Sequence, residues 1–156
     1  MVFDYRRYDK APTGFESEKA TPMPSVVGIP EQEARFRILV VDDDRLIRRT
    51  VKRLYRRHDV VTVPDGAVAC EVLTVDRGFD LILCDLMMPI MNGMSFHGVV
   101  SERWPDVVSR IVFMTGGPES DEARAFLKEL DGHWLAKPFT AAELELVTHR
   151  VAANSG

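Results

Sequence analysis

The fold is decided at residues 38–44, which read Ile-Leu-Val-Val-Asp-Asp-Asp. Four apolar residues in a row suit a β-strand that is covered on both faces, as the strands of a parallel sheet are. Three aspartates follow at once, where such a strand would end. The same kind of apolar run recurs at residues 60–63, 80–84, 110–114 and 133–136. The sequence therefore predicts five strands.

Apolar residues at helical spacing fill the intervals between these runs, and a further helix follows the last run. The predicted helices lie at about 44–57, from Asp65 onward, around 96–100 before Pro105, around 123–130 before Gly132, and around 144–151. Asp65 is expected to cap the second helix, and Thr140 with Glu143 has the form of a capping box before the last. Strands that alternate with helices in this way predict right-handed crossovers and a parallel α/β sheet.

Polar side chains stand at the carboxyl ends of the predicted strands, the edge where such sheets bind ligands. They are Asp42, Asp43 and Asp44 after the first strand, Asp85 after the third, Thr115 after the fourth and Lys137 after the fifth. Carboxylates brought close together repel one another, and a hard divalent cation such as Mg²⁺ removes that conflict. A central carboxylate could then attack phosphorus and form an acyl phosphate. The lysine and the threonine would bind the phosphoryl oxygens.

Each of these side chains also has an ordinary structural interpretation. An aspartate after a strand commonly caps the next helix, as we expect of Asp44. Asp85 could form a turn before Pro89, Thr115 could simply end a strand, and Lys137 could be a solvated surface charge. The functional interpretation is favoured because all four features coincide at the one edge where this fold binds ligands.

Residues 36–151 resemble the receiver domains of response regulators. The resemblance rests on four pieces in order, which are residues 38–44, 85–93 (Asp-Leu-Met-Met-Pro-Ile-Met-Asn-Gly), 113–116 (Phe-Met-Thr-Gly) and 135–139 (Leu-Ala-Lys-Pro-Phe). It implies a flavodoxin-like (βα)5 fold, a doubly wound five-stranded parallel sheet with strand order 2-1-3-4-5. We expect a receiver domain at 36–153, an N-terminal tail or linker at 1–35 and a short tail at 154–156.

The same resemblance implies a role for each acidic residue. Asp85 would accept the phosphoryl group from a phosphohistidine of a histidine kinase or a histidine phosphotransfer domain. Asp43 would bind Mg²⁺ directly, and Asp42 directly or through a water molecule. Asp85 and the backbone carbonyl of Met87 would complete the protein ligands.

The resemblance extends to the strands that follow. Thr115 and Lys137 would bind the phosphoryl oxygens, and the peptide bond before Pro138 would be cis. Trp134 stands where the family often has a Tyr or Phe that acts as a switch, so it is either a bulkier switch residue or a partly buried surface side chain. Met87 offers no polar group that could help water attack the acyl phosphate, and we therefore predict slow self-dephosphorylation.

We expect phosphorylation of Asp85 to switch the binding of a partner protein, and two other functions are the alternatives. Phosphatases of the haloacid-dehalogenase type also use an Asp nucleophile with Mg²⁺, but they need a second Asp two residues later, where this chain has Met87. A degenerate receiver that acts as a phosphorylation-independent binding module is the other alternative. Every acceptor-site residue is present, which argues against it, and we do not expect an enzyme that acts on other molecules.

Composition bears on location and partners. A net charge of −4 and a pI near 5.6 argue against a dedicated nucleic-acid binder, so direct DNA binding is not expected. No apolar run reaches about 18 residues and the N-terminus lacks a signal pattern, so we expect a cytoplasmic protein without a membrane span. Cys70 and Cys84 match neither a zinc site nor a disulfide framework, and both are expected to be buried.

The first predicted helix is strongly basic and could steer an acidic partner, although a solvated face is the ordinary interpretation. Its basic residues are Arg45, Arg48, Arg49, Lys52, Arg53, Arg56 and Arg57. The sequence predicts either a single-domain regulator or the terminal receiver of a hybrid histidine kinase. It leaves the downstream protein partner unidentified and the formation of a homodimer open.

Overall fold

A computed structural model describes residues 34–117, 120–130 and 132–154. Its five parallel strands form one sheet in the order β2-β1-β3-β4-β5. The strands are β1 (Arg37–Val41), β2 (Asp59–Val63), β3 (Leu81–Asp85), β4 (Ile111–Thr115) and β5 (Trp134–Ala136). The predicted α/β class, strand number and strand order are therefore confirmed. The predicted tail at 1–35 lies outside the described residues apart from its last two positions.

Six helices occur among the described residues. They are α1 (Arg45–Leu54), α2 (Gly66–Val75), α3 (Gly93–Arg103), α4 (Pro105–Val108), α5 (Asp121–Glu129) and α6 (Ala141–Asn154). Five of them were predicted, and α4 was not. Pro105 does end the helix before it, but it also opens α4, a single turn, because proline is well suited to the first helical position. The last helix also runs three residues beyond the predicted end at Val151.

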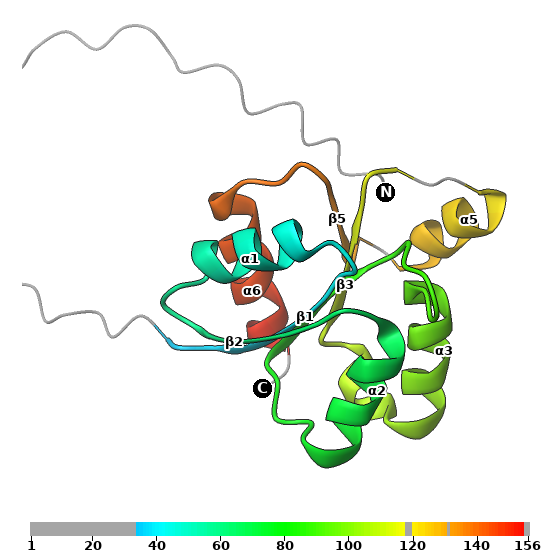
Figure 1. Cartoon of the computed structure of the whole chain (residues 1–156), viewed down its shortest axis with the longest axis horizontal. Coiled ribbons are helices and arrows are strands. Elements are labelled where there is room, and N and C mark those ends of the chain that lie inside the picture. Colours follow the sequence, from blue (N-terminus) through cyan, green and yellow to red (C-terminus); the bar gives the residue numbers. More distant parts are fainter. Residues whose placement is uncertain (1–33, 118–119, 131, 155–156) are drawn as a thin grey trace, which may run out of the picture. The chain divides into compact units, whose positions relative to one another are not determined.

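The helices cover both faces of the sheet, as Figure 1 shows. Alternate residues of β1 point to opposite faces, so Ile38 and Val40 belong to one core and Leu39 and Val41 to the other. The first core packs against α1 and α6 through Val51, Tyr55, Leu144 and Val151. The second packs against α2, α3 and α5 through Ala69, Leu73, Phe96, Val100 and Leu127. Burial on both faces explains why the strands read as unbroken apolar runs.

Helix caps form where the sequence predicts them. The Asp44 carboxylate accepts a hydrogen bond from Leu46 N at 2.7 Å, and Asp65 caps α2 in the same way. At the start of α6, Thr140 and Glu143 bond to each other's backbone N–H groups. These caps satisfy N–H groups that a helix leaves without a partner, and they fix where each loop turns into its helix.

The two cysteines differ in environment. Cys84 is fully buried in β3, as predicted, whereas Cys70 is only half-buried. The prediction was wrong for Cys70 because this residue lies at the margin of the core, packed against it from one side of α2. Within the part of the chain that the structure describes, no helix combines the length and apolar character that a membrane span needs.

Candidate functional site

The site lies where the strand order reverses, between the neighbouring strands β1 and β3. The chain leaves β1 toward α1 and leaves β3 toward α3, which cover opposite faces of the sheet. In sheets of this kind, ligands bind outside the carboxyl ends of the strands where such loops diverge. Asp42 directly follows β1 and Asp85 is the last residue of β3, so both carboxylates stand at this edge of the sheet.

Three carboxylates converge at this point. One oxygen each from Asp42, Asp43 and Asp85 lies within 4.8 Å of the others. Asp42 and Asp85 are buried, whereas Asp43 is exposed. Three carboxylates are the kind of oxygen donors that a hard divalent cation takes. The chemistry of this donor set therefore fits Mg²⁺, and the exposed Asp43 leaves the cluster open toward solvent.

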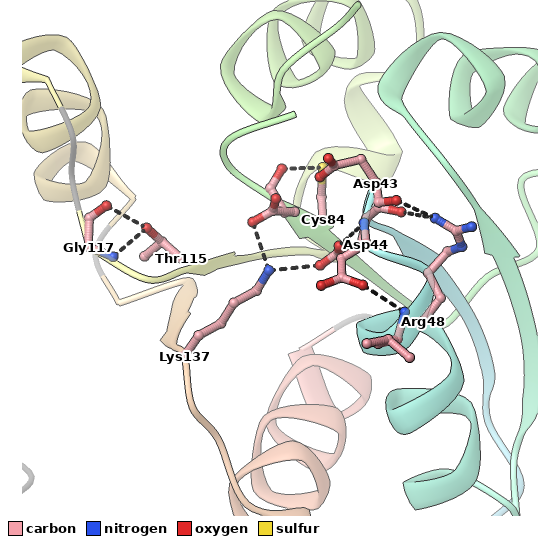
Figure 2. A network of polar contacts seen from close by, with 10 residues as sticks. Asp43, Asp44, Arg48, Cys84, Thr115, Gly117 and Lys137 are labelled. Carbon is pink, nitrogen blue, oxygen red and sulfur yellow. Dashed lines mark hydrogen bonds and ion pairs between the residues drawn. The ribbon is translucent and has the colours of Figure 1, made fainter. Parts of the chain in front are cut away.

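Lys137 bridges the two buried carboxylates. Its Nζ donates to Asp42 Oδ2 at 2.8 Å and to Asp85 Oδ1 at 3.1 Å (Figure 2). The lysine follows β5, and its backbone N–H donates to Thr115 O at 2.7 Å, which extends the pairing of β5 with β4. The peptide bond between Lys137 and Pro138 is cis, as the resemblance to the receiver family implies.

Charge and burial shift the ionisation of both partners. Burial raises the pKa of Asp85 above its ordinary value, Lys137 acts in the opposite direction, and the negative charges of Asp42 and Asp43 add to the rise. Burial acts to lower the pKa of Lys137, but its hydrogen bonds and ion pairs with Asp42 and Asp85 outweigh burial and raise it. Lys137 is therefore charged at neutral pH. A second positive charge beside Asp85, such as that of a bound cation, would favour the carboxylate form of Asp85.

Thr115 stands at the predicted strand end, but its hydroxyl is engaged in a local turn. Thr115 Oγ1 accepts a hydrogen bond from Gly117 N at 3.0 Å and donates to Gly117 O at 3.2 Å. Figure 2 shows the Thr115 hydroxyl pointing toward Gly117 and away from the ammonium group of Lys137. Gly117 has a φ of 131°, a backbone conformation that favours glycine. The structure thus brings Thr115 to the correct edge without joining its hydroxyl to the acidic cluster.

The two remaining predicted residues lie around the cluster. Met87 is in the loop that follows β3, and its side chain is exposed. Trp134 opens β5 with 39% of its surface exposed, three residues before Lys137. Trp134 is therefore partly exposed on the edge strand of the sheet, and its role as a switch residue stays a prediction.

Two residues near the cluster were not assigned to it by the sequence prediction. Arg48 was assigned to the basic face of the first helix, yet its Nη1 donates to the backbone carbonyls of Asp42 and Asp43. Gly93 lies so close to β3 that an added Cβ would stand 2.7 Å from Asp85 O. The sequence signals were an arginine one helical turn beyond the aspartates and a glycine at the start of a helix, and neither was specific enough.

The similarity of this chain to known proteins shows its family. A family model described as "Response regulator receiver domain" matches residues 38–149, which is well over half of the chain. The chain belongs to this family. The sequence-based expectation of a receiver domain from a two-component system is therefore confirmed.

Relatives of this receiver domain occur in proteins of different architecture. The two-component response regulator ORR3 of Oryza sativa subsp. indica is 31% identical over 125 residues, which cover 79% of this chain and 94% of ORR3. The sensor histidine kinase TmoS of Ectopseudomonas mendocina is 28% identical over 159 residues, which cover 96% of this chain but 16% of TmoS. Similar sequences thus make up nearly all of one relative and a small part of the other.

A solved structure adds information on the metal. The receiver domain of the sensor histidine kinase PA1611 from Pseudomonas aeruginosa PAO1 superposes with a TM-score of 0.67 at 25% identity, over 77% of this chain and 99% of that one. That structure has a magnesium ion coordinated in its active-site cleft. The receiver domain of a Francisella response regulator has a TM-score of 0.66 at 23% identity and supports the fold alone.

Proposed function

We propose that this receiver domain accepts a phosphoryl group on Asp85 from a phosphohistidine of a histidine kinase or a histidine phosphotransfer domain. The observation that carries the proposal is that Asp85 shares Lys137 with Asp42, in a cluster that also contains Asp43. A buried carboxylate that is bonded to a lysine and lies close to two further carboxylates is suited to hold a phosphoryl group and a cation together.

In the proposed reaction, a carboxylate oxygen of Asp85 attacks phosphorus. A P–O bond to Asp85 forms while the P–N bond to the histidine breaks, and the imidazole nitrogen keeps the bonding electrons and takes a proton. Lys137, which already lies 3.1 Å from Asp85 Oδ1, pairs with a phosphoryl oxygen. Asp42, Asp43, Asp85 and the Met87 carbonyl would hold Mg²⁺, which supplies charge neutralisation and polarises the phosphoryl oxygens when bound.

The signal would then pass through Thr115. Its hydroxyl exchanges its bonds with Gly117 for a bond to a phosphoryl oxygen, which releases the turn at residues 115–117. Trp134 lies on the neighbouring strand and responds to that change. The two arrangements differ in their affinity for a downstream protein partner, so phosphorylation shifts the population between them.

The phosphodonor would meet the basic side of α1. Arg45, Arg49 and Lys52 are exposed on this helix, and so is the apolar side chain of Leu46 at its start. Positive charge around an acidic pocket steers an acidic partner toward it. The matched relatives support both predicted architectures, the single-domain regulator and the receiver of a hybrid kinase.

We further propose that the phosphorylated state is long-lived. The side chain of Met87 is exposed beside the cluster and carries no group that could orient an attacking water molecule. The decay of phosphorylated protein, followed by intact mass after removal of the donor, is expected to take many minutes. A half-life of seconds would contradict this assignment for Met87.

The proposed function is tested by incubating the full chain with Mg²⁺ and acetyl phosphate and measuring its intact mass. The expected result is the addition of one phosphoryl group, which is lost when Asp85→Asn is used or when EDTA removes the metal. Asp106→Asn is the matched control because this aspartate is exposed on α4. Equal labelling of Asp85→Asn would show that the acceptor is a different residue, and labelling of the parent in EDTA would argue against a role for the cation.

A further inference from the structure

Arg48 binds the backbone of the loop that carries the three consecutive aspartates. Its Nη1 donates to Asp42 O at 2.5 Å and to Asp43 O at 3.0 Å, and its backbone N–H donates to Asp44 O at 3.0 Å. One residue thus satisfies the carbonyl oxygens of all three aspartates. Figure 2 shows the guanidinium and the ammonium group of Lys137 on opposite sides of this loop.

The two side-chain hydrogen bonds of Arg48 fix the backbone conformation of Asp43. The Asp42 carbonyl belongs to the peptide group before the Asp43 Cα atom, and the Asp43 carbonyl belongs to the peptide group after it. Because a peptide group is planar, holding both groups sets φ and ψ of Asp43 and therefore the direction of its Cα–Cβ bond. Arg48 can reach back to this loop because side chains of a helix lean toward its N-terminus.

Asp43 depends on such support more than the other two carboxylates do. Asp85 belongs to a strand paired on both sides, and Asp42 is buried and bonded to Lys137. Asp43 is exposed and lies in the loop after β1. The mutual repulsion of the three carboxylates favours an arrangement in which an unrestrained Asp43 turns away from the others.

We propose that Arg48 is a positioning residue for the cation site, which holds the β1–α1 loop so that the Asp43 carboxylate faces Asp42 and Asp85. This inference rests on the proposed function, since it assumes that the cluster binds a divalent cation. The positive charge of Arg48 would by itself repel that cation. Removal of the Arg48 side chain should therefore weaken cation binding if Arg48 positions the loop, and strengthen it if only the charge of Arg48 matters.

The test measures Mn²⁺ binding to the full chain by the EPR signal of free Mn²⁺. If Arg48 positions the loop, Arg48→Ala weakens Mn²⁺ binding by about tenfold, as loss of a group that orients metal ligands does. Arg48→Lys keeps the charge and can still donate to a carbonyl from a shorter side chain, so it restores part of the loss. If Arg48 acts only through its charge or only on a docking partner, Arg48→Ala binds Mn²⁺ more tightly or equally, and either result overturns the proposal.

Three controls separate the possible causes. Arg49→Ala removes an exposed arginine from the neighbouring position and should change Mn²⁺ affinity by less than about twofold, because its charge is screened by solvent and salt. Asp43→Asn removes the carboxylate itself. Its loss of Mn²⁺ affinity sets the upper limit for the loss that a misplaced Asp43 carboxylate can cause. Thermal unfolding of each variant shows whether it is folded, and Arg48→Gln and Arg48→Lys carry the test if Arg48→Ala unfolds.

A second measurement separates the effect of Arg48 on metal binding from any effect on phosphoryl transfer. Arg48→Ala should label poorly with acetyl phosphate at low Mg²⁺ and recover to the parent rate at saturating Mg²⁺, since Asp85 and Lys137 are untouched. A rate that stays low at saturating Mg²⁺ would overturn the positioning role. If the parent neither binds Mn²⁺ nor becomes labelled, the proposed function fails and takes this inference with it. If the parent does both and Arg48→Ala matches it, only the inference on Arg48 fails.

Discussion

The two halves of the site are built in different ways. On the side of β1 and β3, the carboxylates of Asp42 and Asp85 are buried and share one lysine, which bonds to both of them. On the side of β4 and β5, the Thr115 hydroxyl bonds within its own turn and Trp134 lies at the surface. The first half already has the arrangement that the proposed chemistry needs, whereas the second has an arrangement that a bound phosphoryl group would change. We infer that the phosphoryl group is bound in the acidic half and that the threonine half changes its conformation in response.

The largest effect is expected for Lys137, which belongs to the acidic half although it follows the edge strand. In Lys137→Ala, no ammonium group remains to pair with the phosphoryl oxygen, and labelling by acetyl phosphate should slow by about a hundredfold. Mn²⁺ binding should not weaken, since removing a competing positive charge leaves the carboxylates in place. Labelling at the parent rate would show that Lys137 only neutralises the two buried aspartates.

The close approach of α3 to β3 gives the next largest effect. In Gly93→Ala, the new methyl group would lie 2.7 Å from Asp85 O and 3.0 Å from the Leu86 Cα atom. Because both neighbours are backbone atoms, the variant should lose about 2 kcal/mol in the free energy of unfolding, measured by urea titration. Gly98→Ala is the matched control in the same helix, where nothing lies within 4 Å of the added atom. It should gain about 0.5–1 kcal/mol, and an equal loss in both variants would contradict the argument.

Substitution of Thr115 should change the labelling rate least. It shows most clearly whether the two halves of the site have separate roles. Thr115→Ala keeps the whole acidic half, so its labelling rate should stay within about tenfold of the parent, less than the effect of losing Lys137. In a Trp104→Phe background, the fluorescence of Trp134 should change on phosphorylation of the parent. The same change should be absent in Thr115→Ala, and its persistence there would separate Trp134 from the threonine.

Much of this molecule could be predicted from local patterns. The strands were found because residues buried on both faces form unbroken apolar runs, and Asp44, Asp65 and Thr140 were found as caps because capping depends on neighbours two or three positions away. The carboxylates of the cluster were predicted to lie together because they end strands of one parallel sheet. In each case a rule on sequence spacing was sufficient.

What could not be predicted depends on side-chain direction or on contacts between distant segments. Arg48 looked like one more exposed basic residue, because nothing in its spacing shows that it reaches back to two carbonyls. Gly93 could not be interpreted without the distance between α3 and β3. The bond of the Thr115 hydroxyl to a phosphoryl oxygen stays a prediction, and its two local bonds to Gly117 could not be foreseen because they depend on the backbone turn that follows β4.

The central claim is that one carboxylate in the acidic half carries the phosphoryl group, and chemical localisation tests it most directly. The chain labelled with acetyl phosphate is treated with borohydride, which reduces the acyl phosphate to an alcohol, and its peptides are then sequenced by mass spectrometry. We expect homoserine at position 85 and unmodified aspartate at positions 42 and 43. Reduction at either of those two residues, with Asp85 unmodified, would contradict it.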